Sequence, residues 1–396
     1  ALMSKVIGIV EGVRTAIGRA GGTIARFRAE ELGAIAIRGI VDKTGIDPNL
    51  IEDVVMGLSN SWHAAYNPSR WAVLKAGLPY SVPGVTVERQ CSSGLQAINF
   101  AATQIMAGLG DIYIAGGMES WSSTPWMLPR ADAAYSFTPP QIIRRETAPT
   151  PEDSLVMGVT AENLVKLYKL TREEQDAFGL RSQERAARAI KAGYFKEEII
   201  PVKVPQKKGE IIFDTDEHPR ETTMEKLAAL PPAFLKDGTV TAGSSSGRND
   251  AAAAVLVMTL DKAKELGFTP KARWVTCGVA GVDPKIMGIG PAFAIPKALK
   301  RAGLKMQDMD VVELNEAFAA QVLACVKELE AQGHSFNTEK INPYGGAIAF
   351  GHPNGMSGTR IAIFAINEMR RSNGRYAICS LCIGGGQGLA TIFERM

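Results

Sequence analysis

The chain has 396 residues, of which 46% are hydrophobic and 21% are charged, and its formal net charge at pH 7 is +3. This composition predicts a globular protein with a substantial core, and so small a charge argues against dependence on nucleic acid. No apolar run approaches the roughly 20 residues that a membrane-spanning helix needs. Because the first residues also lack the features of a signal or transit peptide, we expect a cytoplasmic protein that is not bound to a membrane.

The first third of the chain alternates between predicted strands and predicted helices. Apolar runs bounded by turn residues predict strands at residues 6–10, 53–57, 85–87 and 111–117. Helical patterns cover residues 29–43 and 67–76, and a third helix is predicted to follow Cys91.

The last third repeats this plan. Residues 45–55 and 303–312 share a glycine, a short turn, an aspartate and a β-branched strand. Around the second copy we predict strands at residues 274–279, 311–314 and 376–386, and helices at residues 291–301, 317–332 and from Gly355 onward. The repetition predicts a duplicated α/β domain with mostly parallel sheets.

The region between the two copies has a different composition. It is rich in proline, and its two predicted helices cover residues 160–168 and 172–192, the second opened by the capping pair Thr171 and Glu174. We therefore predict three parts of the chain. They are an N-terminal core half (residues 1–120 and 250–273), an inserted loop region (residues 121–249) and a C-terminal core half (residues 274–396).

The five cysteines are an odd number without the spacing of a disulfide framework, which predicts a reducing compartment and no disulfides. Cys379 and Cys382 form a C-x-x-C pair, but it lies in an apolar strand without a matching Cys or His pair, so we expect no metal site. Cys91 would stand at the N-terminal end of a buried helix, where unpaired N–H groups and the macrodipole favour the thiolate. The alternative is that Cys91 is a small core residue.

Four short motifs could carry chemistry. They are Cys91-Ser-Ser-Gly94, Asn315-Glu-Ala-Phe318-Ala, a glycine-rich stretch from Gly345 through His352 to Gly358, and Cys382-Ile-Gly384-Gly-Gly-Gln-Gly388. Each has a second interpretation when it is taken alone. Asn315 could cap a helix, and His352 could be a turn residue hydrogen-bonded to the backbone.

Taken together and in this order on a duplicated α/β chain, these motifs resemble those of the thiolase family. The resemblance extends from residues 13–18 to residues 382–388 and includes residues 157–163 and 237–243 of the inserted region. It implies a thiolase-type α/β/α/β/α fold with mixed, mostly parallel sheets and an inserted loop domain. It also implies an acyltransferase that uses coenzyme A (CoA) thioesters as substrates and products, without a permanently bound cofactor or metal.

The resemblance assigns a role to each of five residues. Cys91 would be the nucleophile that forms an acyl-enzyme, activated by His352. Cys382 would give and take the proton at C2 of the thioester. His352 and a water held by Asn315 would stabilise the enolate oxygen, and the backbone N–H groups of Cys91 and Gly384 would hold the tetrahedral intermediate.

The resemblance also implies where CoA binds and how the chain assembles. Five residues match positions along the path of the pantetheine and nucleotide: Met157, Arg220, Phe234, Ser246 and Phe318. A homodimer or homotetramer is implied, with a possible association with another enzyme of the same pathway.

Four positions depart from the family pattern. Glu88 replaces Asn, Val156 replaces His, Ser244-Ser-Ser246 replaces Asn-Ala-Ser, and Arg248 replaces an aliphatic residue. None of these changes removes a catalytic group. The missing His beside Met157 argues against a dedicated acetoacetyl-CoA synthase. Arg248 and Glu88 would suit a polar, carboxylated acyl chain, because Arg binds carboxylates bidentately.

We therefore expect a degradative thiolase that cleaves a medium, branched or functionalised 3-ketoacyl-CoA. The alternatives are an acetyl-CoA acetyltransferase that makes acetoacetyl-CoA, a decarboxylating ketoacyl synthase, and a non-catalytic protein that binds acyl-CoA or lipid. The presence of both His352 and Cys382 argues against the last two.

Overall fold

The computed structural model describes residues 5–60, 64–131, 133–134 and 138–396. Residues 1–4 and 61–63 of the predicted N-terminal half, and residues 132 and 135–137 of the predicted inserted region, lie outside the described residues. Within these ranges, no helix is long and apolar enough to cross a membrane.

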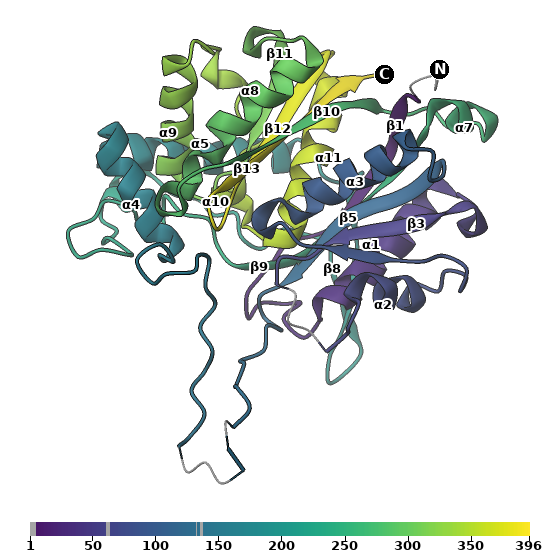
Figure 1. The fold of residues 1–396 in the computed structure, drawn as a ribbon, viewed down its shortest axis with the longest axis horizontal. Coiled ribbons are helices and arrows are strands. Elements are labelled where there is room, and N and C mark those ends of the chain that lie inside the picture. The colour runs from purple at the N-terminus through teal and green to yellow at the C-terminus, as the bar shows by residue number, and fades with distance from the viewer. Residues whose placement is uncertain (1–4, 61–63, 132, 135–137) are drawn as a thin grey trace.

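A single continuous sheet runs through the molecule (Figure 1). In spatial order its main strands are β11 (Met309–Leu314), β12 (Tyr376–Ile383), β13 (Gln387–Arg395), β10 (Ala272–Gly281), β1 (Ile7–Thr15), β9 (Asn249–Thr259), β5 (Ile112–Ser120), β3 (Asp53–Gly57) and β4 (Val85–Val87). The short strands β2 (Gly18–Arg19) and β6 (Ile199–Ile200) pair with β9 and β1, and β7 (Val202–Pro205) and β8 (Glu210–Phe213) form a separate hairpin.

The sheet has an internal two-fold pattern. β1 and β10 pair antiparallel at its centre, and the strands that follow outward correspond on the two sides. β9, β5 and β3 follow β1, whereas β13, β12 and β11 follow β10, with the same relative directions on both sides. The repeat that the sequence predicts is therefore confirmed.

The expectation of mostly parallel strands is wrong. Only β11–β12, β5–β3 and β3–β4 run parallel along the main order of the sheet. Four of the five antiparallel pairings involve β9 or β13, two strands that the sequence patterns did not predict, and the fifth joins β1 to β10. β9 begins with a run of alanines that gives no clear strand signal, and β13 follows β12 through a tight glycine turn, which forces antiparallel pairing.

The helices divide the core into separate layers. One hydrophobic cluster surrounds α3 (Ser93–Met106) and α11 (Asn354–Ser372), which lie side by side in the middle of the molecule. A second involves α1 (Ala29–Thr44) and α2 (Pro68–Lys75), and a third involves α8 (Gly290–Ala302) and α9 (Ala319–Ala331). Successive residues of β9 point alternately to the first and second clusters, as the pleat of a strand requires.

The two long helices of the predicted inserted region pack on the C-terminal side of the sheet, whereas Val202, Val204 and Phe213 of its hairpin pack in the cluster of α1 and α2. α4 (Met157–Tyr168) and α5 (Arg172–Lys191) contribute Leu164 and Phe178 to the cluster of α8 and α9. The predicted capping box of Thr171 and Glu174 is present at the start of α5. Ahead of α4, the chain between β5 and α4 makes a long excursion away from the body (Figure 1). The short helices α6 (Met224–Ala228), α7 (Leu260–Glu265) and α10 (Ala347–Phe350) complete the fold.

The two central helices approach each other through glycine. A Cβ placed on Gly94 of α3 would lie 2.7 Å from the carbonyl oxygen of Gly355 at the start of α11. A Cβ placed on Gly358 of α11 would lie 2.4 Å from the backbone nitrogen of Leu95. Both contacts are with backbone atoms, which cannot turn aside, so any side chain at either glycine would push the two helices apart.

We therefore expect Gly358→Ala to destabilise the fold. The added methyl overpacks a rigid contact, which costs about 3 kcal/mol and lowers the urea midpoint of unfolding. The matched control is Gly281→Ala, because the nearest atom to its Cβ would be the oxygen of Gly386 at 4.0 Å. Equal urea midpoints for the two variants would contradict this account of the helix contact.

Candidate active site

Cys91 lies in a single 3₁₀ turn, Gln90–Ser92, directly ahead of α3, and its side chain is partly buried. The residue before it, Gln90, has a φ of 44°, which is unusual for a residue with a side chain. Glu88 holds this turn, since its carboxylate accepts from the backbone N–H of Gln90 at 2.6 Å and from Gln90 Nε2 at 2.7 Å. The carboxylate of Glu88 thus supports the loop of Cys91.

The sulfur of Cys91 meets several N–H groups and a second thiol. Asn354 donates from Nδ2 to the sulfur at 3.2 Å, and the backbone N–H of Gly384 also donates to it. Cys382, buried at the end of β12, is close enough to Cys91 for the two sulfurs to interact electrostatically. The structure therefore brings Cys91, Cys382 and Gly384 together, as the motifs imply.

Burial dominates the titration of both thiols. Loss of solvent raises the pKa of Cys91 to about 11, an effect that the hydrogen bonds from Asn354 and Gly384 partly offset and that the carboxylate of Glu119 increases. The pKa of Cys382 is raised well above its ordinary value. Burial is the largest cause, and the neighbouring Cys91 is the next. Burial therefore opposes the thiolate that the helix start was expected to favour in the resting protein.

His352 is a buried, neutral imidazole. Its Nδ1 lies 2.6 Å from Ser357 Oγ, whose own hydrogen is donated to the carbonyl of Pro353 at 3.2 Å. The hydroxyl must therefore accept from Nδ1–H, which leaves Nε2 unprotonated and able to accept. The pKa of His352 is lowered to about 3. Burial is the larger cause, and the positive charge of Arg360 adds to it.

Asn315 lies beside His352. Its Nδ2 is 3.5 Å from Nε2 of His352, and its Oδ1 is buried without a protein partner among the described residues. Asn315 does not cap α9, because the residue in that position is Phe318 and α9 has no side-chain cap. A buried, unpartnered amide oxygen beside an imidazole is suited to hold a water molecule.

The turn between β12 and β13 requires glycine. Gly385 and Gly386 have φ values of 84° and 85°, and a Cβ on Gly386 would lie 2.2 Å from the carbonyl oxygen of Val282. Gly384 is different, since a Cβ there would meet only side chains, each 3.8 Å away. One of these is the sulfur of Met157, which places the start of α4 at the edge of the site.

Four of the five residues implied in CoA binding lie close together. Phe234 and Phe318 pack edge to face with ring centroids 5.8 Å apart, and the Phe234 ring also covers Gly158 next to Met157. Ser246 donates its backbone N–H to the carbonyl of Ala317, next to Phe318. Arg220 lies on a neighbouring segment and donates from Nη2 to the carbonyl of Ala242 at 3.4 Å.

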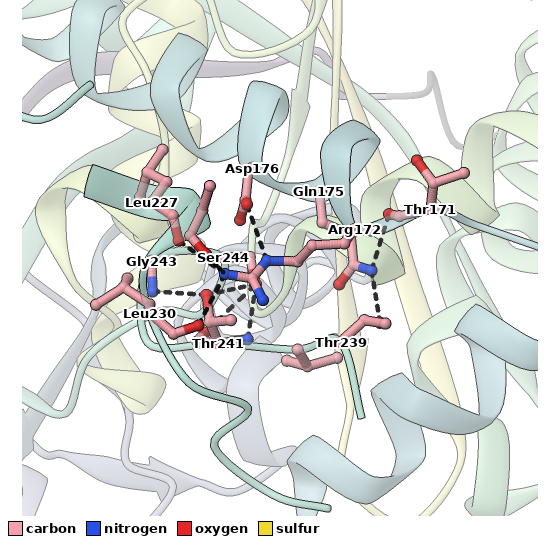
Figure 2. A network of polar contacts seen from close by, with 12 residues as sticks. Thr171, Arg172, Gln175, Asp176, Leu227, Leu230, Thr239, Thr241, Gly243 and Ser244 are labelled. Carbon is pink, nitrogen blue, oxygen red and sulfur yellow. Dashed lines mark hydrogen bonds and ion pairs between the residues drawn. The ribbon is translucent and has the colours of Figure 1, made fainter. Parts of the chain in front are cut away.

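The segment that carries Ser246 is anchored to α5 by a polar network (Figure 2). Arg172 on α5 pairs with Asp176 at 2.8 Å and donates to the carbonyls of Leu227 and Leu230. Gln175, also on α5, donates from Nε2 to Thr239 Oγ1 at 2.9 Å, and Thr241 donates its backbone N–H to Ser244 Oγ at 3.0 Å. Hydrogen bonds at buried positions hold backbone geometry, so this segment offers a fixed wall to the site.

Sequence reasoning missed two residues at the site, Asn354 and Glu119. Asn354 lies in the glycine-rich stretch from Gly345 to Gly358, but its position in the sequence does not indicate that it is a neighbour of Cys91. Glu119 is buried at the end of β5 and accepts from the backbone N–H of Gly355 at 2.9 Å. Burial raises the pKa of Glu119 to about 7. Within the described ranges, no group of His, Cys, Asp and Glu has the arrangement of a metal site.

The pKa directions predict the pH dependence of Cys91 alkylation. Below a pKa of about 11, the thiolate fraction rises tenfold with each pH unit. The rate of modification by iodoacetamide should therefore rise continuously from pH 7 to pH 10. Intact-mass spectrometry measures the rate, with Cys91→Ser giving the background. A plateau below pH 8 would mean that the resting thiolate forms after all.

Comparisons with known proteins place the whole chain in one family. The family model for the thiolase N-terminal domain matches residues 7–261, and the model for the thiolase C-terminal domain matches residues 268–395. An acetyl-CoA acetyltransferase of Syntrophomonas wolfei is 45% identical over 399 residues, covering 100% of both chains. A 3-oxoadipyl-CoA/3-oxo-5,6-dehydrosuberyl-CoA thiolase of Escherichia coli is 46% identical, covering 98% of this chain and 99% of the relative.

Solved structures agree with the sequence matches. The acetyl-CoA acetyltransferase of Bacillus anthracis has a TM-score of 0.94 and 42% identity, covering 100% of both chains. Human mitochondrial 3-ketoacyl-CoA thiolase in complex with CoA has a TM-score of 0.92 and 40% identity, covering 100% of this chain and 99% of the human one. The fold, the paired thiols and these matches lead to one conclusion: the chain belongs to the thiolase family and is an acyltransferase enzyme of that family.

Proposed function

We propose that this enzyme cleaves a 3-ketoacyl-CoA with free CoA, giving acetyl-CoA or another acyl-CoA product and a shortened acyl-CoA. The observation that carries the proposal is the pair of thiols, Cys91 and Cys382, in one site with N–H donors directed at the sulfur of Cys91. A non-catalytic acyl-CoA-binding protein would have no need of a second buried thiol beside the first.

The first half-reaction makes the acyl-enzyme. The Cys91 sulfur adds to the C3 carbonyl while His352, neutral and unprotonated at Nε2, takes the thiol proton. The C2–C3 bond then breaks, and its electron pair passes into the enolate of the departing thioester. Cys382 gives its proton to C2, which releases acetyl-CoA and leaves the acyl group on Cys91.

The second half-reaction regenerates the enzyme. The thiol of free CoA gives its proton to the Cys382 thiolate and adds to the acyl carbonyl. Cys91 leaves as a thiolate and recovers the proton held by His352. The backbone N–H groups of Cys91 and Gly384 hold the oxyanion at Cys91, and a water on Asn315, together with His352, stabilises the enolate oxygen.

Arg248 is the residue that we propose selects the acyl chain. Its side chain is exposed, and its guanidinium lies 4.9 Å from the ring centroid of Trp121 without an ion pair to any described carboxylate. Its backbone lies beside His352, since His352 donates its N–H to the carbonyl of Gly247 at 3.2 Å. A cation without a carboxylate partner near the site favours an acyl chain that ends in a carboxylate. One relative is a thiolase whose name gives such substrates, 3-oxoadipyl-CoA among them.

The second candidate is synthesis of acetoacetyl-CoA from acetyl-CoA, the same chemistry in reverse. Several relatives are acetyl-CoA acetyltransferases, which favours this candidate. Arg248 favours cleavage, because an acetyl group has no charge for it to bind.

Binding of CoA is proposed at Met157, Arg220, Phe234, Ser246 and Phe318. The support is the packing of four of them into one wall and the CoA complex of the human relative.

Self-association as a homodimer or homotetramer is also proposed. β4 ends the sheet with an exposed Val85, and an unpaired edge strand can pair with a second copy. We also propose a cytoplasmic location, a role in fatty acid β-oxidation and association with another enzyme of the same pathway. The division of the chain into three parts is likewise proposed.

Substitution of the thiols tests the mechanism. We expect Cys91→Ser to reduce thiolysis of a 3-ketoacyl-CoA by at least about a thousandfold, because the nucleophile is lost. Cys382→Ser should reduce it about a hundredfold or more, because a general acid is lost. Thiolysis is measured from the loss of 3-ketoacyl-CoA absorbance. Cys277→Ser is the matched control, as Cys277 is also partly exposed and free. Normal activity of Cys91→Ser would exclude the acyl-enzyme.

Substitution of Arg248 tests the substrate class. We expect Arg248→Ala to lower kcat/KM about tenfold or more for a 3-ketoacyl-CoA ending in a carboxylate, because a charged hydrogen bond is lost. Cleavage of an uncharged chain of equal length should fall much less, and Arg248→Lys should retain part of the preference. Arg38→Ala, on the surface of α1, is the control. Equal losses on both substrates, or none on either, would exclude a carboxylate subsite at Arg248.

A further inference from the structure

The side chain of Asn354 joins two elements that are far apart in the sequence. Asn354 is the first residue of α11, and its amide bonds to neither its own helix nor its own loop. It contacts Cys91, which precedes α3, through Nδ2 at 3.2 Å. It also contacts Trp121, which follows β5, through Oδ1 at 2.8 Å from the indole Nε1.

The partners of Asn354 fix which way its amide points. An indole N–H can only donate a hydrogen bond, so the atom of Asn354 that meets Trp121 must be the oxygen. The other end of the amide, which faces Cys91, must then be the NH₂ group. Trp121 therefore determines that Asn354 presents its NH₂ group to the sulfur of Cys91. This holds whether Cys91 is a thiol or a thiolate.

The guanidinium of Arg248 restrains Trp121 from the other side. It stacks over the indole ring at 4.9 Å from the centroid, and both Trp121 and Asn354 are half-buried. An aromatic ring held by a cation on its face and by a hydrogen bond at its edge has little freedom to turn. Because the indole N–H holds Oδ1 of Asn354, the position of the Asn354 amide relative to the sulfur of Cys91 is restrained as well.

The side-chain donor has a task that the backbone donors cannot perform. Under the proposed function, the N–H groups of Cys91 and Gly384 bind the substrate oxygen during acyl transfer. They are then occupied, and only Asn354 among the donors described above remains on the sulfur. Hydrogen bonds to a charged atom are stronger than those to a neutral one, so such a donor stabilises the thiolate before attack and again as the leaving group.

We propose that Asn354 is a catalytic residue, the side-chain donor that stabilises the Cys91 thiolate, and that Trp121 is the positioning residue that orients its amide. The proposal depends on the proposed function only for the role of Cys91 as nucleophile. Of the contacts that lower the pKa of Cys91, the hydrogen bond from Asn354 is the largest.

The test measures alkylation of Cys91 by iodoacetamide, followed by intact mass, between pH 7 and pH 9.5. In Asn354→Leu, which has a similar size but no donor, we expect the rate at pH 8 to fall about tenfold, with the whole profile displaced to higher pH. In Trp121→Phe, which keeps a ring beneath Arg248 but removes the indole N–H, the fall should be about threefold, because the amide is free to turn. In both variants, kcat for thiolysis should fall more than KM changes.

The matched control is Trp71→Phe. Trp71 on α2 also lies beneath an arginine, with the guanidinium of Arg28 at 4.8 Å from its ring centroid, but it is not part of the site. Its alkylation profile should superimpose on that of the unchanged protein. Should Asn354→Leu fail to fold, as judged by circular dichroism, Trp121→Phe alone decides. Profiles for the folded variants that superimpose on the unchanged protein would overturn the proposal. Alkylation needs no thioester, so this result does not depend on whether the enzyme cleaves a 3-ketoacyl-CoA.

Discussion

The close contact between α3 and α11 is the constraint on which the active site depends. The side-chain-free surfaces of Gly94 and Gly358 let the two helices touch through backbone atoms. Because α3 begins just after Cys91 and α11 begins just after His352, this contact brings the starts of both helices to one place. The glycine turn after β12 then adds Cys382 and Gly384. A duplicated fold thus contributes one thiol from each half of the chain.

The site consists mainly of groups that are neutral at rest. Burial keeps both thiols protonated and His352 uncharged, with a pKa of about 3 for the imidazole and about 11 for Cys91. Under the proposed mechanism, charge develops only when a proton moves from sulfur to nitrogen or carbon, and the N–H groups of Asn354 and Gly384 are already directed at the sulfur of Cys91. Such preorganised donors act most strongly where water is excluded. An exposed, permanently ionised thiolate would instead react with any electrophile that reached it.

The sequence predicted the fold well where patterns are local. The repeated unit around Asp53 and Asp310, the capping box at Thr171 and the helix after Cys91 follow from residues that are near one another in the chain. The direction of β9 and β13 does not, because it depends on pairing between distant segments. At the site, the motifs named Cys91, His352, Cys382 and Asn315. The pKa of Cys91 and the contact with Asn354 could not be inferred, since burial and side-chain direction are properties of the folded chain.

The formation of an acyl group on Cys91 is the most direct test of the account. The protein would be incubated with acetyl-CoA or a 3-ketoacyl-CoA without free CoA, and its intact mass and peptide masses recorded. The account predicts one acyl group per chain, located on Cys91, absent from Cys91→Ser and removed when free CoA is added. If the unchanged protein gave no adduct while alkylation showed the thiol to be free, the chain would bind acyl-CoA without reacting, and the account would be wrong.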